Sequence, residues 1–68
     1  MEKLGDRLRK QRQLNKLTQQ ELADRIGINR GAYSNWENGK REPSFSKLIE
    51  LSKLLNTTPN YLLGISDA

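Results

Sequence analysis

The 68-residue sequence contains no cysteine and no histidine. Without cysteine there are no disulfides and no thiolate metal ligands, and without histidine the most common metal ligand and general base is missing. A glycine-rich phosphate loop and paired carboxylates in a region able to form a pocket are also lacking. We therefore expect no enzyme activity, no metal, no cofactor and no small-molecule ligand.

A long apolar run is missing as well. The chain begins with Met1, Glu2 and Lys3 and nowhere strings together the apolar residues that a signal peptide or a membrane span requires. A chain of this length makes one small domain, here residues 1–68, which buries only about 60% of the surface that its unfolded chain exposes. A soluble, cytoplasmic protein without a membrane partner is expected.

Charge is plentiful but unevenly placed. The formal net charge is +4, and the segment before Leu17 alone holds this whole excess. A general affinity for polyanions would therefore come from the first predicted helix and from local pairs such as Lys40 and Arg41. For Arg9 and Lys10 taken singly, a basic surface that only aids solubility is an equally good interpretation. The cations of the segment are Lys3, Arg7, Arg9, Lys10, Arg12 and Lys16, and its acids are Glu2 and Asp6.

Residues 18–39 have the pattern of two short helices joined by a tight turn. Thr18 followed by Glu21 three positions later is a capping box, which predicts a helix start. Gly27 ends that helix, because glycine enters the left-handed conformation of a helix terminus at the lowest steric cost. Asn29 then caps a second helix that runs to about Asn38. The pattern predicts a helix-turn-helix motif at about residues 19–38.

The second helix of this motif has two different faces when its residues are placed at about 100° intervals. Ala32, Tyr33 and Trp36 share the arc that packs. The opposite arc contains no carboxylate, and its arginine and asparagine side chains match the edges of guanine and adenine, respectively. An ordinary solvated helix surface is the alternative interpretation. The residues of this outer arc are Arg30, Gly31, Ser34, Asn35 and Asn38.

Periodicity and capping residues predict an all-α fold, a compact five-helix bundle. The helices are expected at residues 3–15, 19–26, 30–38, 45–55 and 59–63. Ser44 caps the fourth helix, Thr58 followed by Pro59 begins the fifth, and Gly64 ends it. The predicted core consists of Leu4, Leu8, Leu22, Ala23, Ile26, Ile28, Tyr33, Trp36, Phe45, Leu48, Leu51, Leu55, Leu62 and Leu63.

A partly buried ion pair is expected between Arg12 and Glu37. Arg12 lies on the inner side of the first helix, about one turn after Leu8, and Glu37 borders the packed arc of the second motif helix. Burial of two charges is costly unless they meet with good geometry. Such a pair would fix the first helix against the second motif helix and would neutralise an acid that otherwise repels phosphate.

The segment LTQQELADRIGINRGAYSNWENGKREPS resembles the Cro and phage-repressor type of helix-turn-helix family, also called the xenobiotic-response-element family or lambda-repressor-like DNA-binding domains. The motifs that carry this resemblance are Leu17–Ala23, the central Gly27, Trp36–Lys40 and Pro43–Ser44. The resemblance covers nearly the whole chain. It implies a five-helix bundle in which the third helix enters the DNA major groove.

Position by position, the resemblance also implies site residues. The helix after the turn would supply the base-reading set, and residues around both motif helices would contact phosphates and so position the protein. Arg12 and Glu37 match the family's buried ion pair. The implied base-reading residues are Arg30, Gly31, Ser34, Asn35 and Asn29, with Arg30 and Asn35 as the main readers. The implied phosphate-binding residues are Gln19, Thr18, Asn38, Lys40, Arg41 and Arg9, of which Thr18 mainly caps its helix.

Two positions depart from the family pattern. Gly31 stands where relatives often carry a base-reading side chain, and glycine inside a helix costs roughly 1 kcal/mol relative to alanine. Tyr33 is larger than the aliphatic residue that is common there. Its ring is expected to pack, and core packing alone accounts better for it than a phosphate contact by its hydroxyl.

The sequence thus predicts a regulator of transcription that binds double-stranded DNA sequence-specifically, a repressor acting as a homodimer on a pseudo-palindromic operator. A cytoplasmic, nucleoid-associated protein of a prokaryote or phage is expected. The alternative is a protein-interaction module with the same fold, such as an antitoxin, an antirepressor or an adaptor. Acidic or apolar residues on the outer arc would have favoured that alternative.

A twofold interface is expected because one such domain makes few base contacts. Candidate interface residues are Leu54, Tyr61 and Ile65, together with Ile49; the equally good interpretation is that they complete a small core. Two further alternatives stay open, since the chain is either a whole small regulator or the amino-terminal head of a longer repressor.

Overall fold

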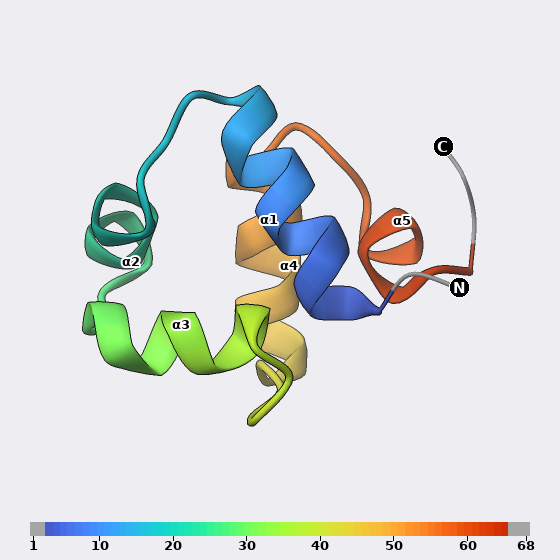
Figure 1. Cartoon of the computed structure of the whole chain (residues 1–68). Coiled ribbons are helices and arrows are strands. Elements are labelled where there is room, and N and C mark those ends of the chain that lie inside the picture. Colours follow the sequence, from blue (N-terminus) through green and yellow to red (C-terminus); the bar gives the residue numbers. More distant parts are fainter. Residues whose placement is uncertain (1–2, 66–68) are drawn as a thin grey trace.

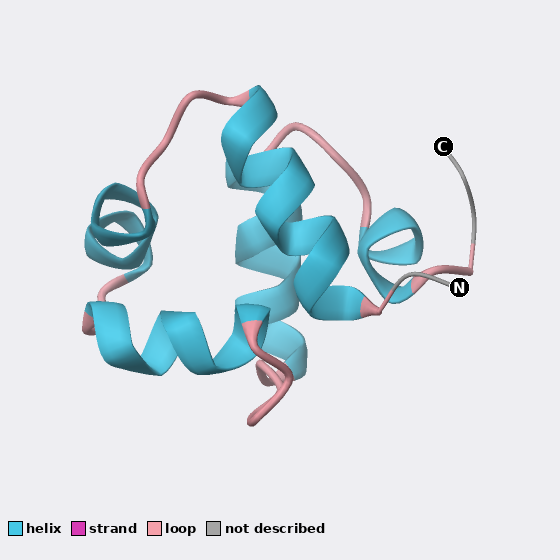
Figure 2. Cartoon of the chain, viewed as in Figure 1, coloured by secondary structure: helices cyan, strands magenta, loops and turns pink. Residues whose placement is uncertain are grey.

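The computed structural model describes residues 3–65, and the elements in this range are five α-helices. They confirm the predicted all-α fold, and their boundaries agree with the predicted ones within one residue (Figures 1 and 2). The helices are α1 (Leu4–Leu14), α2 (Gln19–Ile26), α3 (Arg30–Glu37), α4 (Phe45–Leu54) and α5 (Pro59–Leu63).

Short-range capping interactions set these boundaries. At four helix starts, a side-chain oxygen accepts a hydrogen bond from the backbone N–H three residues later, which satisfies a donor that the helix itself leaves unpaired. Two helices end at a glycine in the left-handed region, Gly27 with φ 76° and Gly64 with φ 79°. The capping residues at the starts are Thr18, Asn29, Ser44 and Thr58, as predicted.

One core joins the five helices. Helix α1 packs against α3 and α5, α2 packs against α3 and α4, and α4 packs against α5. In Figure 1, α4 runs behind α1, while α2 and α3 lie on one side of this pair and α5 on the other. The buried apolar residues are Leu8, Leu17, Leu22, Ala23, Ile26, Tyr33, Leu48, Leu51, Leu55 and Leu62, and the partly buried ones around them are Leu4, Ile28, Trp36, Leu54 and Tyr61.

The prediction that Phe45 and Leu63 belong to the core is wrong. Phe45 is 83% exposed and Leu63 is 46% exposed. Phe45 is the first residue of α4 and Leu63 the last of α5, so each lies at a helix end, beyond the stretch that neighbouring helices cover. Leu17 is buried although it lies between helices, where a search for helical periodicity finds no signal.

The crossing of α1 over the end of α3 depends on a glycine. A Cβ atom added to Gly5 would lie 2.2 Å from the carbonyl oxygen of Glu37, far inside van der Waals contact. Gly5 therefore lets α1 approach the last turn of α3 at the distance of backbone contact. Nothing in the helical periodicity of the first segment points to this role.

Candidate nucleic-acid interface

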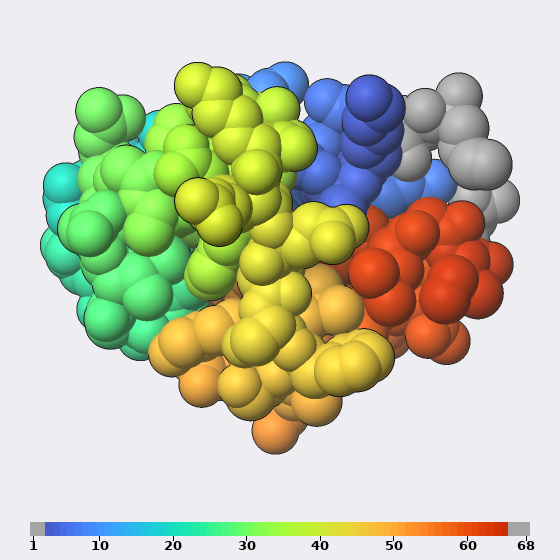
Figure 3. Space-filling model, turned by 90° about the horizontal axis from the view of Figure 1, so that it is seen from below, coloured from blue at the N-terminus to red at the C-terminus, as the bar shows by residue number. Residues whose placement is uncertain are grey.

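The predicted base-reading residues lie on the outer side of α3. Arg30 and Gly31 are exposed, while Ser34 and Asn35 are partly exposed. In the space-filling view of Figure 3, α3 and the loop that follows it occupy adjoining parts of one face. Asn29 is exposed as well, but its Oδ1 accepts a hydrogen bond of 2.7 Å from the N–H of Ala32, so its side chain caps α3.

The loop after α3 folds back on the helix. Gly39 adopts the left-handed conformation with φ 78°, and the N–H groups of Lys40 and Arg41 donate to the carbonyl of Asn35 at 2.9 and 3.2 Å. The side chain of Asn38 donates from Nδ2 to Ser34 Oγ at 3.3 Å. These bonds hold three predicted phosphate-binding residues, Asn38, Lys40 and Arg41, exposed at the C-terminal end of α3.

The structure brings Arg12 and Glu37 together as an ion pair. Arg12 Nε donates to Glu37 Oε2 at 2.7 Å and Arg12 Nη2 to Glu37 Oε1 at 3.3 Å, a bidentate arrangement. The remaining Nη1 donates to the carbonyl of Leu17 at 2.8 Å. Because both charged groups are largely removed from water, this pairing is what makes their burial tolerable.

Tyr33 also points its hydroxyl at Glu37. The hydroxyl donates to Glu37 Oε2 at 2.5 Å inside the core, and the ring packs edge-on against Trp36 with centroids 5.9 Å apart. Burial, followed by the hydrogen bond to Glu37, raises the pKa of Tyr33, so the phenol stays protonated. Tyr33 is thus a buried partner of Glu37, and its hydroxyl is not on the outer surface.

Opposing effects set the charge of Glu37. Burial alone would raise the pKa of Glu37, but hydrogen bonds from Arg12, Tyr33 and Gln19 outweigh it, and the pKa is lowered. The hydrogen bond to Glu37 raises the pKa of Arg12 in turn. Both members of the pair are therefore charged at neutral pH, and the acid of α3 is compensated within the protein.

Two predicted phosphate-binding residues also contact Glu37. Gln19 Nε2 donates to Glu37 Oε1 at 3.0 Å, and Arg9 Nε lies 3.5 Å from the same oxygen. Gln19 Oε1 accepts a hydrogen bond of 3.1 Å from Arg30 Nη1. We call Glu37 with its partners Arg9, Arg12, Gln19 and Tyr33 the Glu37 cluster. From the sequence, Arg9 and Gln19 were expected to bind phosphate and only Arg12 was expected to pair with Glu37, so the contacts of Arg9, Gln19 and Tyr33 with this carboxylate were missed.

The first helix carries the whole basic excess of the sequence, but two of its cations are turned inward, Arg12 as expected and Arg7 not anticipated. Arg7 is buried, with Nη1 donating to the carbonyl of Tyr61 at 3.0 Å and the guanidinium stacked 4.6 Å from the centre of the Tyr61 ring. Arg12 is turned inward as well. Helical position alone did not identify Arg7, because its partner lies 54 residues away. Arg9 stays partly exposed.

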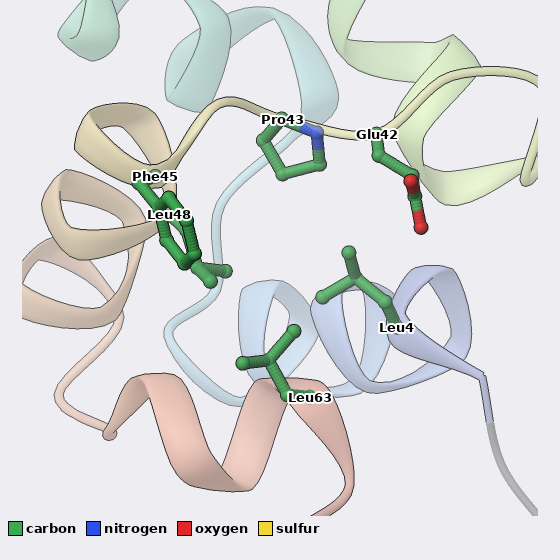
Figure 4. Close-up of a pocket in the computed structure, with 6 residues that line it drawn as sticks. All are labelled: Leu4, Glu42, Pro43, Phe45, Leu48 and Leu63. Carbon is green, nitrogen blue, oxygen red and sulfur yellow. The ribbon is translucent and has the colours of Figure 1, made fainter.

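The candidate dimer residues differ in placement. Leu54 and Tyr61 pack against the core and are only partly exposed, whereas Ile65 is 72% exposed. A shallow apolar groove opens nearby, between the start of α1, the start of α4 and the end of α5 (Figure 4). Figure 4 shows Leu4, Phe45, Leu48 and Leu63 around this groove, with Pro43 and Glu42 above it.

Comparison with known proteins assigns the family. The model of the family described as Helix-turn-helix matches residues 8–62, which is most of the chain. The chain belongs to the Cro and phage-repressor type of helix-turn-helix family. This assignment confirms the resemblance found in the sequence.

Relatives within this helix-turn-helix family match along nearly the whole chain. The uncharacterized HTH-type transcriptional regulator YqaE of Bacillus subtilis is 47% identical over 59 residues, which are 87% of this chain and 51% of YqaE. The repressor protein C2 of Salmonella phage P22 is 38% identical over 88% of this chain and 28% of its own length. The chain thus spans about half the length of YqaE and less of C2.

A solved structure of the family has the same fold. The crystal structure of the P22 c2 repressor in complex with a synthetic operator superposes with a TM-score of 0.87 at 36% identity, and the match covers 93% of this chain and 96% of that one.

Within the described part of the present chain, residues 3–65, no helix has the length and apolar character needed to cross a membrane.

Proposed function

We propose that this chain binds double-stranded DNA sequence-specifically by inserting α3 into the major groove, and that it acts as a cytoplasmic repressor of transcription in a bacterium or phage. The observation that carries the proposal is the charge of α3. Its one acid, Glu37, is 4% exposed and paired with Arg12, so the outer side of the helix offers phosphates and bases no carboxylate. The likeness to an operator-bound phage repressor supports it.

Within this proposal the exposed polar residues divide into two groups. Arg30 and Asn35 read bases, because a guanidinium matches the two acceptors of guanine and a carboxamide matches adenine. Ser34, Gly31 and Asn29 complete the proposed base-reading set, in which Gly31 offers only its backbone and Asn29 also caps α3. The groups that position the domain on the phosphates are Gln19, Thr18, Asn38, Lys40, Arg41 and Arg9.

The decisive experiment is selection of duplexes from a random DNA pool by the purified chain at roughly physiological salt, where non-specific attraction is screened. Enrichment of a motif supports base reading. Failure of a folded sample to enrich any motif would favour the alternative protein-interaction module.

On the selected duplex, Arg30→Ala is expected to cost about 1 to 3 kcal/mol of binding free energy, with little loss on unrelated DNA.

A phosphate contact has a different signature. Lys40→Ala should weaken binding to every sequence and reduce the salt dependence by about one unit of slope. Lys53→Ala is the matched control, because Lys53 is an exposed lysine in the last turn of α4 and lies outside the proposed phosphate-binding set. Equal salt slopes for wild type and Lys40→Ala would remove Lys40 from the phosphate-binding set.

We further propose that the chain works on DNA as a homodimer that meets through the apolar groove. The exposed Phe45 lines this groove together with Leu4, Leu48 and Leu63, so the patch offers apolar surface that a second copy of the chain would cover, with the same patch on both copies. In Figure 3 the segment in yellow, which leads into α4, lies between α3 and α5, so the groove adjoins the proposed DNA-binding face.

The dimensions of the protein are compatible with this arrangement. Half-sites one helical turn apart place the two reading helices about 34 Å apart, so each α3 lies about 17 Å from the twofold axis. The protein measures 28 × 23 × 20 Å, and a contact at one edge leaves room for that distance. Phe45→Ser should abolish cooperative binding to a two-part site, while Leu14→Ser, at another exposed apolar residue, in α1, should not. Equal cooperativity in both variants would argue against this groove as the interface.

A further inference from the structure

Asn38 and Gly39 form the one asparagine–glycine step of the chain. Such a step is chemically labile, because glycine has no Cβ atom to hinder the approach of its backbone nitrogen to the preceding carboxamide. The sequence alone therefore distinguishes Asn38 from every other asparagine. The residues that follow the other five asparagines all carry side chains and are Lys16, Arg30, Trp36, Thr57 and Tyr61.

The structure leaves this step exposed and weakly held. Both residues are exposed directly after α3, in the loop that projects beyond that helix in Figure 1. Asn38 Nδ2 donates to Ser34 Oγ at 3.3 Å and the N–H of Gly39 donates to the carbonyl of Trp36 at 3.4 Å, and both hydrogen bonds are longer than usual. Local opening of an exposed loop costs little free energy. The nitrogen of Gly39 can thus leave Trp36 and turn toward the carboxamide carbon of Asn38.

The surroundings of this step favour a reaction between the two residues. The nitrogen of Gly39 becomes a nucleophile when it loses its proton, and the two cations that follow it, Lys40 and Arg41, stabilise the negative charge that results. A polar hollow between the start of α1 and the end of α3 is lined by Arg9, Asn38 and Gly39, among others. This hollow gives water access to the same bond.

We propose that Asn38 is a site of spontaneous deamidation and that this modification inactivates the proposed DNA-binding face. The nitrogen of Gly39, deprotonated by hydroxide, forms a bond to Cγ of Asn38. The Nδ2 group takes up a proton from water and leaves as ammonia, so that a succinimide ring closes. Water then opens the ring at one of its two carbonyl carbons, which leaves aspartate or isoaspartate at position 38. In total, water is consumed and ammonia is released, and nothing is oxidised or reduced.

Either product changes the surface that we propose binds DNA. A carboxylate appears beside Lys40 and Arg41, which we propose bind phosphates, and at the C-terminal end of α3, where the helix dipole is already negative. Isoaspartate also adds a methylene group to the main chain, which moves the N–H groups of Lys40 and Arg41 away from the carbonyl of Asn35 that they bond. This loss of DNA binding rests on the proposed function, whereas the modification itself does not.

Incubation of the folded protein in mildly alkaline buffer, followed by peptide mapping with mass spectrometry, tests the modification. Deamidation is expected to accumulate at Asn38 before it is detected at any of the other five asparagines. The modified protein carries an additional negative charge, so ion exchange separates it from the intact protein. Its affinity for the selected duplex should be lower by about tenfold or more, because a carboxylate placed against phosphates is repulsive.

Three variants complete the experiment. Asn38→Gln removes the reactive step, because a glutamine has to close a larger ring that forms more slowly, so the affinity of this variant should not decline from its own starting value during the incubation. Asn60→Gln is the matched control at an exposed asparagine of α5, which is followed by a tyrosine, and its affinity should decline as in the wild type. Asn38→Asp should have the lower affinity from the start.

Other outcomes would overturn the inference. If Asn38 stays intact in the folded protein but reacts in the urea-unfolded chain, the loop protects it and the proposed site is refuted. A modified protein with the affinity of the intact one would refute the inactivation. Backbone amide NMR separates the inference from the proposed function, since modification should shift the N–H signals of Lys40 and Arg41 whether or not the chain binds DNA. Deamidation at Asn38 with these shifts, but without motif enrichment by the intact protein, would refute only the proposed function.

Discussion

Helix α1 meets α3 and α5 through two different inward-facing arginines. At the junction with α3, Arg12 pairs with Glu37, and the cluster around that acid extends through Gln19 to Arg30 on the outer face. At the junction with α5, Arg7 bonds the carbonyl of Tyr61 and stacks on its ring. One arginine therefore connects the core to the proposed DNA-binding face, whereas the other fastens the last helix to the first.

This difference shows why burial of a charge is informative only together with its partners. Both arginines cost free energy to remove from water, and both are compensated by directed contacts. Only at the junction with α3 do residues that we propose touch DNA, Gln19 and Arg9, take part in the contacts. Stability and binding should therefore change together at this junction and separately at the other.

The largest effect is expected for Arg12→Ala. Its loss leaves Glu37 buried without its bidentate partner, which should lower the free energy of unfolding by about 3 kcal/mol. DNA affinity should fall as well, because the acid is no longer neutralised beside the proposed phosphate contacts. Chemical denaturation and titration of the selected duplex measure the two effects. An unaltered stability would show that the pair contributes little.

Arg7→Ala should come next, with a loss of about 2 kcal/mol in the free energy of unfolding from the missing hydrogen bond and the missing cation–π contact. Under conditions where the variant is folded, its affinity for the selected duplex should equal that of the wild type. Arg25→Ala, at an exposed arginine of α2, serves as the control and should change stability by less than about 0.5 kcal/mol. A loss of affinity in folded Arg7→Ala would erase the contrast between the two junctions.

The pH dependence of stability sharpens the comparison. Because the pKa of Glu37 is lower in the folded protein than its ordinary value of 4.5, the unfolded chain takes up this proton more readily. The stabilisation is thus fully present above about pH 4.5 and is lost as the pH falls through the folded-state pKa, with a slope of at most about 1.4 kcal/mol per pH unit. Glu37→Gln should unfold with a shallower acid dependence than the wild type, and Arg7→Ala should retain the wild-type slope in this range.

The smallest effect is expected for Tyr33→Phe. This change keeps the ring and its packing against Trp36 but removes the hydroxyl that donates to Glu37, so it should cost about 1 kcal/mol. Thermal unfolding of the two proteins measures it. Identical stability would mean that the remaining donors of the Glu37 cluster satisfy the acid without Tyr33.

The fold was largely predictable because its signals are local. Thr18, Asn29, Ser44 and Thr58 cap helices through bonds to residues three positions later, and Gly27 ends a helix through its own backbone conformation. Such signals lie within a few residues of each other and are read directly from the chain. The Arg12–Glu37 contact could also be anticipated, because the two residues have opposite charges and helical periodicity places both on the inward sides of their helices.

Other features were not predictable because they depend on residues that are distant in sequence. Arg7 looks like any cation of a basic helix until Tyr61 covers it, and Gly5 matters only because the backbone of Glu37 passes within contact distance. The prediction that Phe45 is buried was wrong because a partner is missing. Its position suits a core face, but no helix covers the start of α4 there. Periodicity assigns a face to a residue and does not show what lies opposite it.

The sequence by itself determined the number, type and ends of the helices, the polar outer arc of α3 and the family. These follow from interactions along a few turns of chain and from motifs of fixed spacing. Only the tertiary structure decided that one buried carboxylate gathers Arg9, Arg12, Gln19 and Tyr33, and that Gln19 holds Arg30. Hydrogen bonds of this kind require atoms from α1, α2 and α3 to meet within about 3 Å, and that distance is set by how the helices pack.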